Sequence, residues 1–64
     1  MKINTRYIKI AAEDRGWSQR ELARRAGVDP SVLSRAKRTA SVHPSTARRI
    51  ADALGVAVAD VADR

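Results

Sequence analysis

Apolar residues recur along this chain at the spacing of an α-helix, in short segments separated by glycine and proline. No stretch alternates for long with the period of two that is typical of a strand. The breaks fall at Gly16, Gly27, Pro30, Pro44 and Gly55. This pattern predicts an all-α fold, a compact bundle of about five short helices that forms one domain over residues 1–64.

The first predicted helix runs from an N-cap at about Asn4 to Arg15, and Gly16 supplies the left-handed residue that ends it. Its apolar stripe consists of Tyr7, Ile8, Ala11 and Ala12.

The second predicted helix carries the clearest local signal. Ser18 and Glu21 have the spacing of a capping box, in which the Ser18 hydroxyl accepts from the amide of Glu21 and the carboxylate reaches back to Ser18. Trp17 and Leu22 occupy the positions of a hydrophobic staple, and Gly27 ends the helix.

The third helix is expected to begin with Asp29 as N-cap and Pro30 at the first position, where a missing N–H costs nothing. A polar linker from Thr39 to His43 follows it. Ser45 is then expected to cap a fourth helix with the buried side Ala47, Ile50, Ala51 and Leu54.

Gly55 is expected to end the fourth helix. In residues 56–64, Val58, Val61 and Ala62 lie at helical spacing, so the pattern predicts a short fifth helix there.

Composition excludes several function classes. The 64 residues include no cysteine and one histidine, His43, so no disulfide and no metal site of three or four ligands is expected. No nucleophile–base–orienter set is visible, so we expect no enzyme, no cofactor and no small-molecule substrate. The apolar runs are far shorter than the ~20 residues that span a bilayer, and no secretory signal opens the chain, which favours a cytoplasmic protein without a membrane partner.

Positive charge is concentrated in the middle of the chain. The 13 Lys and Arg residues outnumber the 7 Asp and Glu residues, for a net charge of +6. Residues 18–49 carry +6, residues 1–17 carry +2, and residues 50–64, with Arg64 as their only cation, carry −2. Such a distribution is typical of a domain that binds a polyanion.

The individual arginines differ in what they indicate. For Arg20, Arg24 and Arg25, on the outer faces of one helix, a solubilising role fits as well as a recognition role. Arg35 and Arg38 lie on a short helix of otherwise mostly small residues, which favours recognition. An arginine can contact O6 and N7 of guanine together, which a lysine does less well.

Two short helices joined by Gly-Val-Asp form the pattern of a helix-turn-helix. Residues 17–35, WSQRELARRAGVDPSVLSR, resemble the signature of the Xre/Cro–cI repressors, which have the lambda-repressor-like fold. Pro44-Ser45 and residues 50–56, IADALGV, resemble the fourth helix of that family and its end. The resemblance extends over roughly residues 8–61 without a gap.

The resemblance implies two groups of DNA contacts. The positions that face base edges are Pro30, Ser31, Ser34 and Arg35. The positions that contact phosphates, with Arg20 added for its charge, are Gln19, Arg20, Arg38, Thr39, His43 and Ser45.

The sequence departs from the family pattern at three positions. The family often pairs an arginine on the first helix with a glutamate at the end of the third, and these positions hold Ala12 and Lys37. Thr39 replaces the usual glycine after the third helix, and a β-branched residue tolerates positive φ poorly. We therefore expect the third helix to continue past this point or to leave by another turn.

The resemblance also implies the function: a Cro-like transcriptional repressor, of a phage or mobile element, that binds double-stranded DNA sequence-specifically and occludes a promoter. A weak homodimer, strengthened on DNA, would bind a palindromic operator with half-sites about 10 bp apart. The fifth helix or the loop before the fourth would form the dimer contact. The alternative is an antitoxin-type interaction module whose acidic, apolar C-terminal part binds a partner protein.

Overall fold

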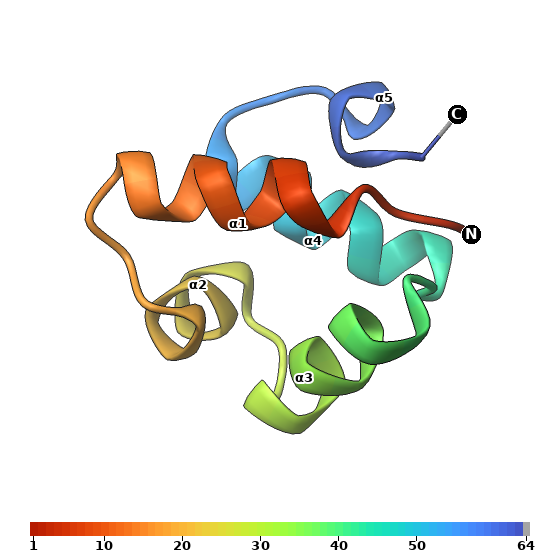
Figure 1. Cartoon of the computed structure of the whole chain (residues 1–64), viewed down its shortest axis with the longest axis horizontal. Helices are drawn as coiled ribbons and strands as arrows, with labels where there is room; N and C mark the ends of the chain where they lie inside the picture. Colours follow the sequence, from red (N-terminus) through yellow and green to blue (C-terminus); the bar gives the residue numbers. More distant parts are fainter. Residues whose placement is uncertain (64) are drawn as a thin grey trace.

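The computed structural model describes residues 1–63, and Arg64 lies outside the described residues. Five helices follow one another, α1 (Thr5–Asp14), α2 (Gln19–Ala26), α3 (Pro30–Thr39), α4 (Pro44–Leu54) and α5 (Val58–Val61) (Figure 1). No strand occurs within residues 1–63, where two isolated β-bridges are the only extended pairing. The all-α fold class and the order of the five helices are confirmed.

The core consists of small and aliphatic side chains, and α4 lies at its centre. This helix packs against α2 and α5, and α1 crosses in front of it in Figure 1. Ala23 of α2 and Ala47 and Ala51 of α4 are completely buried, which lets these helices approach closely. The buried residues are Ile3, Ile8, Ala11, Ala12, Leu22, Ala23, Ala26, Leu33, Ala36, Val42, Ala47, Ile50, Ala51, Leu54 and Val61.

Most of the predicted helix ends are confirmed. Asn4, Ser18 and Asp29 are the N-caps of α1, α2 and α3, and each side chain accepts a hydrogen bond from a backbone N–H of the first turn. Gly27 and Gly55 follow α2 and α4 in the left-handed conformation, both at φ 72°.

The prediction for the start of α4 is wrong by two residues. His43, and not Ser45, is the N-cap: its Nδ1 lies 3.3 Å from the backbone nitrogen of Ser45 and accepts from it. Pro44 causes the shift, because its fixed φ suits the first helical position and its missing N–H costs nothing there. The N-cap therefore falls on the residue before Pro44.

The segment expected to be a polar linker is also different. Thr39 is the last residue of α3, which agrees with the expectation that this helix continues past the usual glycine position. Val42, in the connection that follows, is only 8% exposed. The left-handed residue that ends α3 is Ala40, at φ 55°. The connection is therefore a short loop with one core side chain.

The sequence pattern indicated Asn4 as an N-cap but not the pairing of residues 1–4 with other segments. They run extended between the loop after α3 and the end of α5, with β-bridges from Lys2 to Ser41 and from Ile3 to Ala62. Ile3 is 2% exposed and belongs to the core. Because a single short segment has no periodicity, its pattern alone could not reveal this pairing.

Candidate nucleic-acid interface

The turn between α2 and α3 is fixed by several backbone contacts. The N–H of Gly27 and that of Val28 donate to the carbonyls of Arg24 and Ala23, at 3.2 and 3.0 Å. Val28, the apolar residue of this turn, packs against the core. From α4, Nη1 of Arg49 donates to the carbonyl of Gly27 at 3.1 Å and fixes the turn to the rest of the molecule.

The outer face of α3 is open to solvent, while Leu33 and Ala36 on its inner face are buried. No ion pair engages Arg35 or Arg38 within the part of the chain that the structure describes. Their guanidinium groups are thus available to an external acceptor. The exposed residues of this face include Pro30, Ser31, Ser34, Arg35 and Arg38.

Ser31 is engaged at the start of α3. The Oδ1 atom of Asp29 accepts from the backbone N–H of Ser31 at 2.8 Å and from its hydroxyl at 2.7 Å. These two hydrogen bonds hold the pKa of Asp29 below its ordinary value, the bond from the backbone N–H contributing most. Since the Ser31 proton is used, this hydroxyl can only accept from a base, for example from the amino group of cytosine or adenine.

A shallow groove of about 300 Å³ separates α2 from α3. The buried Oε1 atom of Gln19 has no hydrogen-bond partner within residues 1–63, and the exposed Arg20 borders the same groove. A buried acceptor without a partner is unfavourable, so this amide gains by reorienting when a partner can bond to it. The lining residues are Gln19, Arg20, Pro30, Leu33, Ser34 and Lys37.

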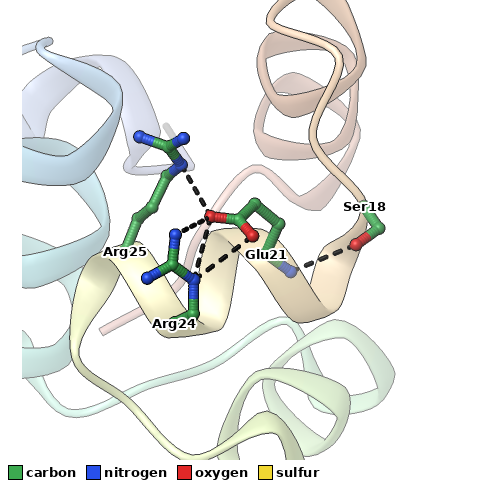
Figure 2. A network of polar contacts seen from close by, with 4 residues as sticks. All are labelled: Ser18, Glu21, Arg24 and Arg25. Atoms are coloured by element: carbon green, nitrogen blue, oxygen red, sulfur yellow. Dashed lines mark hydrogen bonds and ion pairs between the residues drawn. The ribbon is translucent and has the colours of Figure 1, made fainter.

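The other two arginines of α2 are neutralised in part by Glu21 (Figure 2). The carboxylate lies 2.6 Å from Nη2 of Arg24 and 2.8 Å from Nε of Arg25. The hydrogen bonds from Arg24 contribute most to holding the pKa of Glu21 below its ordinary value.

The capping box is accordingly only half formed. The hydroxyl of Ser18 accepts from the Glu21 amide at 3.1 Å, as predicted, but the carboxylate binds the arginines instead of Ser18. Arg25 also lies over the ring of Trp17, 4.4 Å from its centroid. Of the α2 arginines, Arg20 is the one that lacks an acidic partner among the described residues.

A second groove, of about 490 Å³, lies between α3 and the loop that leads to α4. The hydroxyl of Thr39 is already used on this side, since it lies 3.0 Å from the carbonyl oxygen of Arg35, to which it donates. Because Nδ1 of His43 accepts from the Ser45 amide, the neutral imidazole carries its proton on Nε2. The lining residues are Val32, Arg35, Ala36, Thr39, Ser41, Val42, His43 and Thr46.

Six of the ten residues predicted to contact DNA belong to α3, two begin α2, and two lie at the start of α4. Gln19 and Arg20 line the groove on one side of this helix, and Thr39 and His43 line the groove on the other. Arg38 and Ser45 are exposed but belong to neither groove.

Two features of this surface were not predicted from the sequence. Val32 is 39% exposed on α3, and the guanidinium of Arg49 holds the turn. Helical periodicity could have placed Val32 away from Leu33 and Ala36, whereas the contact of Arg49 joins residues 22 positions apart and has no local signal.

Neither a metal-binding cluster nor a membrane-spanning helix is found in the described residues. Within residues 1–63 no group of three or more His, Asp or Glu side chains could hold a metal ion. None of the helices in this part of the chain is long and apolar enough to cross a bilayer.

Comparison with known proteins agrees with this geometry. A family model described as helix-turn-helix matches residues 8–61. This range extends from the second turn of α1 to the end of α5 and includes the turn and both grooves. No curated protein matches the chain, and no solved structure matches it either.

Proposed function

The chain belongs to the Xre/cI-like helix-turn-helix family, and on this premise we propose that it is a sequence-specific repressor that binds a palindromic operator through α3 and occludes a promoter. Proteins of this family are DNA-binding transcription regulators, so the partner is double-stranded DNA. Beyond the family, we infer which residues read the DNA sequence, that two chains bind one operator and that binding represses transcription.

The open face of α3 is the observation that carries the proposal. Arg35 is exposed and has no ion-pair partner among residues 1–63, so its guanidinium can bind O6 and N7 of a guanine in the major groove. Ser31 accepts a donor from a base, and Ser34 contributes a second hydroxyl one turn along. Pro30 has no side-chain donor, so it reads by apolar contact, for instance with a thymine methyl.

The phosphate contacts flank this face on both sides. Gln19 and Arg20 contact the backbone from α2, and Arg38, His43 and Ser45 contact it from the other side of α3, with Nε2–H of His43 as a donor. Thr39 joins them only if its hydroxyl exchanges its bond to the Arg35 carbonyl for one to phosphate. These contacts supply most of the affinity and make it fall steeply with salt.

We further infer that two chains bind one operator, through the loop before α4. Val61 is completely buried and Val58 packs on the core, so α5 presents little apolar surface to a partner. Val32, in contrast, is 39% exposed and borders the groove that Val42 and Thr46 also line. This small apolar area supports a contact that is weak in free solution and strengthened when DNA holds both copies.

Selection of bound duplexes from a random pool by the purified chain tests the proposal. We expect a palindrome with half-sites about 10 bp apart, a stoichiometry of two chains per duplex, and inhibition of in vitro transcription when that sequence overlaps a promoter. Recovery of an unrelated collection of sequences would contradict sequence-specific binding, and unchanged transcription would contradict occlusion.

Arg35→Ala sharpens the test, and Arg24→Ala is a matched control because it removes the same charge from a residue already paired with Glu21. On the selected operator, Arg35→Ala is expected to weaken binding by about 1–3 kcal/mol and to relax the preference at one base pair per half-site. Arg24→Ala should change binding to operator and random duplex equally. Fluorescence anisotropy titrations with both duplexes measure these effects, and equal weakening of both by Arg35→Ala would assign Arg35 to a phosphate.

A further inference from the structure

The end of α3 has an unusual backbone. Ala40 lies at φ 55° and ψ 32°, and within residues 1–63 it is the only residue other than glycine with a positive φ. An L-residue with a Cβ is disfavoured in this conformation, which glycine adopts freely. A local or a non-local contact must therefore hold Ala40 in place.

The helix itself does not supply that contact. Gly27 and Gly55, in the same conformation, each donate their N–H to carbonyls in the last turn of the helix they follow. No such bond from the N–H of Ala40 is found in the described part of the chain. The conformation at the end of α3 therefore lacks the backbone hydrogen bond that the other two helix ends have, and the local contact across Ala40 is a long one from the Thr39 hydroxyl to the carbonyl of Ser41, at 3.3 Å.

Residues 1–4 supply the missing support. The N–H of Ile3 donates to the carbonyl of Ala40 at 3.0 Å. Met1 and Val42 exchange two further hydrogen bonds, from the N–H of Val42 to the Met1 carbonyl at 2.9 Å and from the Met1 nitrogen to the Val42 carbonyl at 3.0 Å. Ile3 and Val42 are both buried, so the pairing also has an apolar anchor.

The same four residues are fixed on their other edge. The N–H of Asn4 donates to the carbonyl of Val61 at 2.8 Å, and that of Asp63 donates to the carbonyl of Lys2 at 3.0 Å. The extended segment thus joins the loop after α3 to the end of α5 and cannot move without one of them. We call residues 1–4 the N-terminal clamp.

We propose that the N-terminal clamp is a positioning element for DNA binding, which holds Ala40 left-handed and thereby sets where the loop of residues 41–43 and the start of α4 lie relative to α3. The inference rests on the proposed function, because that loop carries His43 and leads to Ser45. Without the clamp, residues 40–43 populate other conformations, and the phosphate contacts beyond α3 are lost while the base contacts of α3 remain.

The test removes one hydrogen bond from each edge of the clamp in turn. At this length the chain can be made by chemical synthesis, with the backbone amide of Ile3 replaced by an ester, which deletes the donor to Ala40 and keeps every side chain. The ester also weakens the carbonyl of Lys2 as an acceptor for the N–H of Asp63, so rescue by Ala40→Gly is needed to assign the effect to Ala40. An ester at Asn4 is the matched control, since it deletes the donor to Val61 on the opposite edge.

The Ile3 ester is expected to weaken binding to the selected operator by about two- to tenfold, the range for one hydrogen bond. The slope of log affinity against log salt should stay nearly the same, because residues 40–46 include no Lys or Arg. The selected base preference stays the same. The Asn4 ester should bind within about twofold of the parent chain. Amide hydrogen exchange should speed up at Val42 in the Ile3 ester but not at Val28, which lies in the turn before α3.

Ala40→Gly distinguishes positioning from general loss of stability. Glycine adopts the left-handed conformation unaided, so this substitution should restore most of the affinity that the Ile3 ester loses. Parental binding by the Ile3 ester, equal weakening by both esters, or no rescue by glycine would each overturn the proposal. Failure of the parent chain to bind any duplex would instead refute the proposed function, and the exchange at Val42 would still report whether the clamp holds the loop.

Discussion

The two ends of α3 are built in different ways. At its start, the left-handed Gly27, the N-cap Asp29 and Pro30 at the first helical position all lie within four residues of one another. At its end, Ala40 takes nearly the same backbone conformation as Gly27, but its carbonyl is held by Ile3, 37 positions away in the sequence.

This difference separates local from non-local control of one helix. Glycine needs no help to be left-handed, so the start of α3 forms wherever its own residues are present. The same conformation costs alanine roughly 1–2 kcal/mol, so the end of α3 depends on the hydrogen bond from Ile3. Changes at the start should therefore act through local conformation, and changes at the end through the N-terminal clamp.

The largest effect is expected for Gly27→Ala. A Cβ at position 27 would meet the guanidinium of Arg49 at an ordinary contact distance of 3.6 Å, so the cost comes from the backbone at φ 72°. We expect a loss of about 1–2 kcal/mol in the free energy of unfolding, and a melting temperature lower by roughly 4–8 °C for each kcal/mol. Thermal denaturation, monitored by circular dichroism, measures the change in melting temperature.

Gly55→Ala is the matched control for this substitution. Gly55 has the same φ, and a Cβ added there would meet no atom of residues 1–63 within 4 Å, so the backbone cost should be equal. Because Gly55 follows α4 and not α2, its substitution should leave the operator affinity of the folded chain unchanged, whereas Gly27→Ala should lower it by tilting α3. Equal affinities for the two variants would show that the turn does not control the orientation of α3.

The same distinction explains what could be predicted from the sequence. The N-caps Asn4, Ser18 and Asp29 and the glycine helix ends depend on residues within one turn, and the structure confirms them. The buried faces of α1 and α4 follow from helical periodicity in the same way.

Features that join distant residues could not be predicted in this way. Ile3 and Val42 do not belong to a series of apolar residues at helical spacing. Nothing near them in the sequence therefore indicated that both are buried or that the segments around them pair. The replacement of the expected glycine by Thr39 did predict a longer helix, but not that Ala40 would take the left-handed position. At the candidate site, the exposed face of α3 could be predicted, whereas the internal hydrogen bonds of Ser31 and Thr39 could not.

A smaller effect is expected at the N-cap of α3. Asp29→Ala removes the acceptor for the N–H of Ser31, and loss of an N-cap should lower the melting temperature by roughly 4–8 °C. Asp29→Asn keeps an acceptor oxygen at the same place and should lower the melting temperature much less. If both variants have the same melting temperature, the charge of Asp29, and not its role as N-cap, stabilises the start of α3.

The smallest effect is the response of the two ends of α3 to acid. One titration measures both ends in the same molecule. The pKa of Asp29 is lowered in the folded chain by the bonds from Ser31, so its contribution to stability is complete above the ordinary value of 3.8 and is lost as pH falls through the lower folded value. No ionisable side chain takes part in the backbone bonds that join Ile3 to Ala40 and Met1 to Val42. We therefore expect the amide proton of Ser31 to shift below about pH 4 in an NMR titration while that of Val42 stays constant, and Asp29→Asn to abolish the shift at Ser31. A parallel change at both amides would mean that acid loosens α3 as a whole, and that its start and its end are not controlled separately.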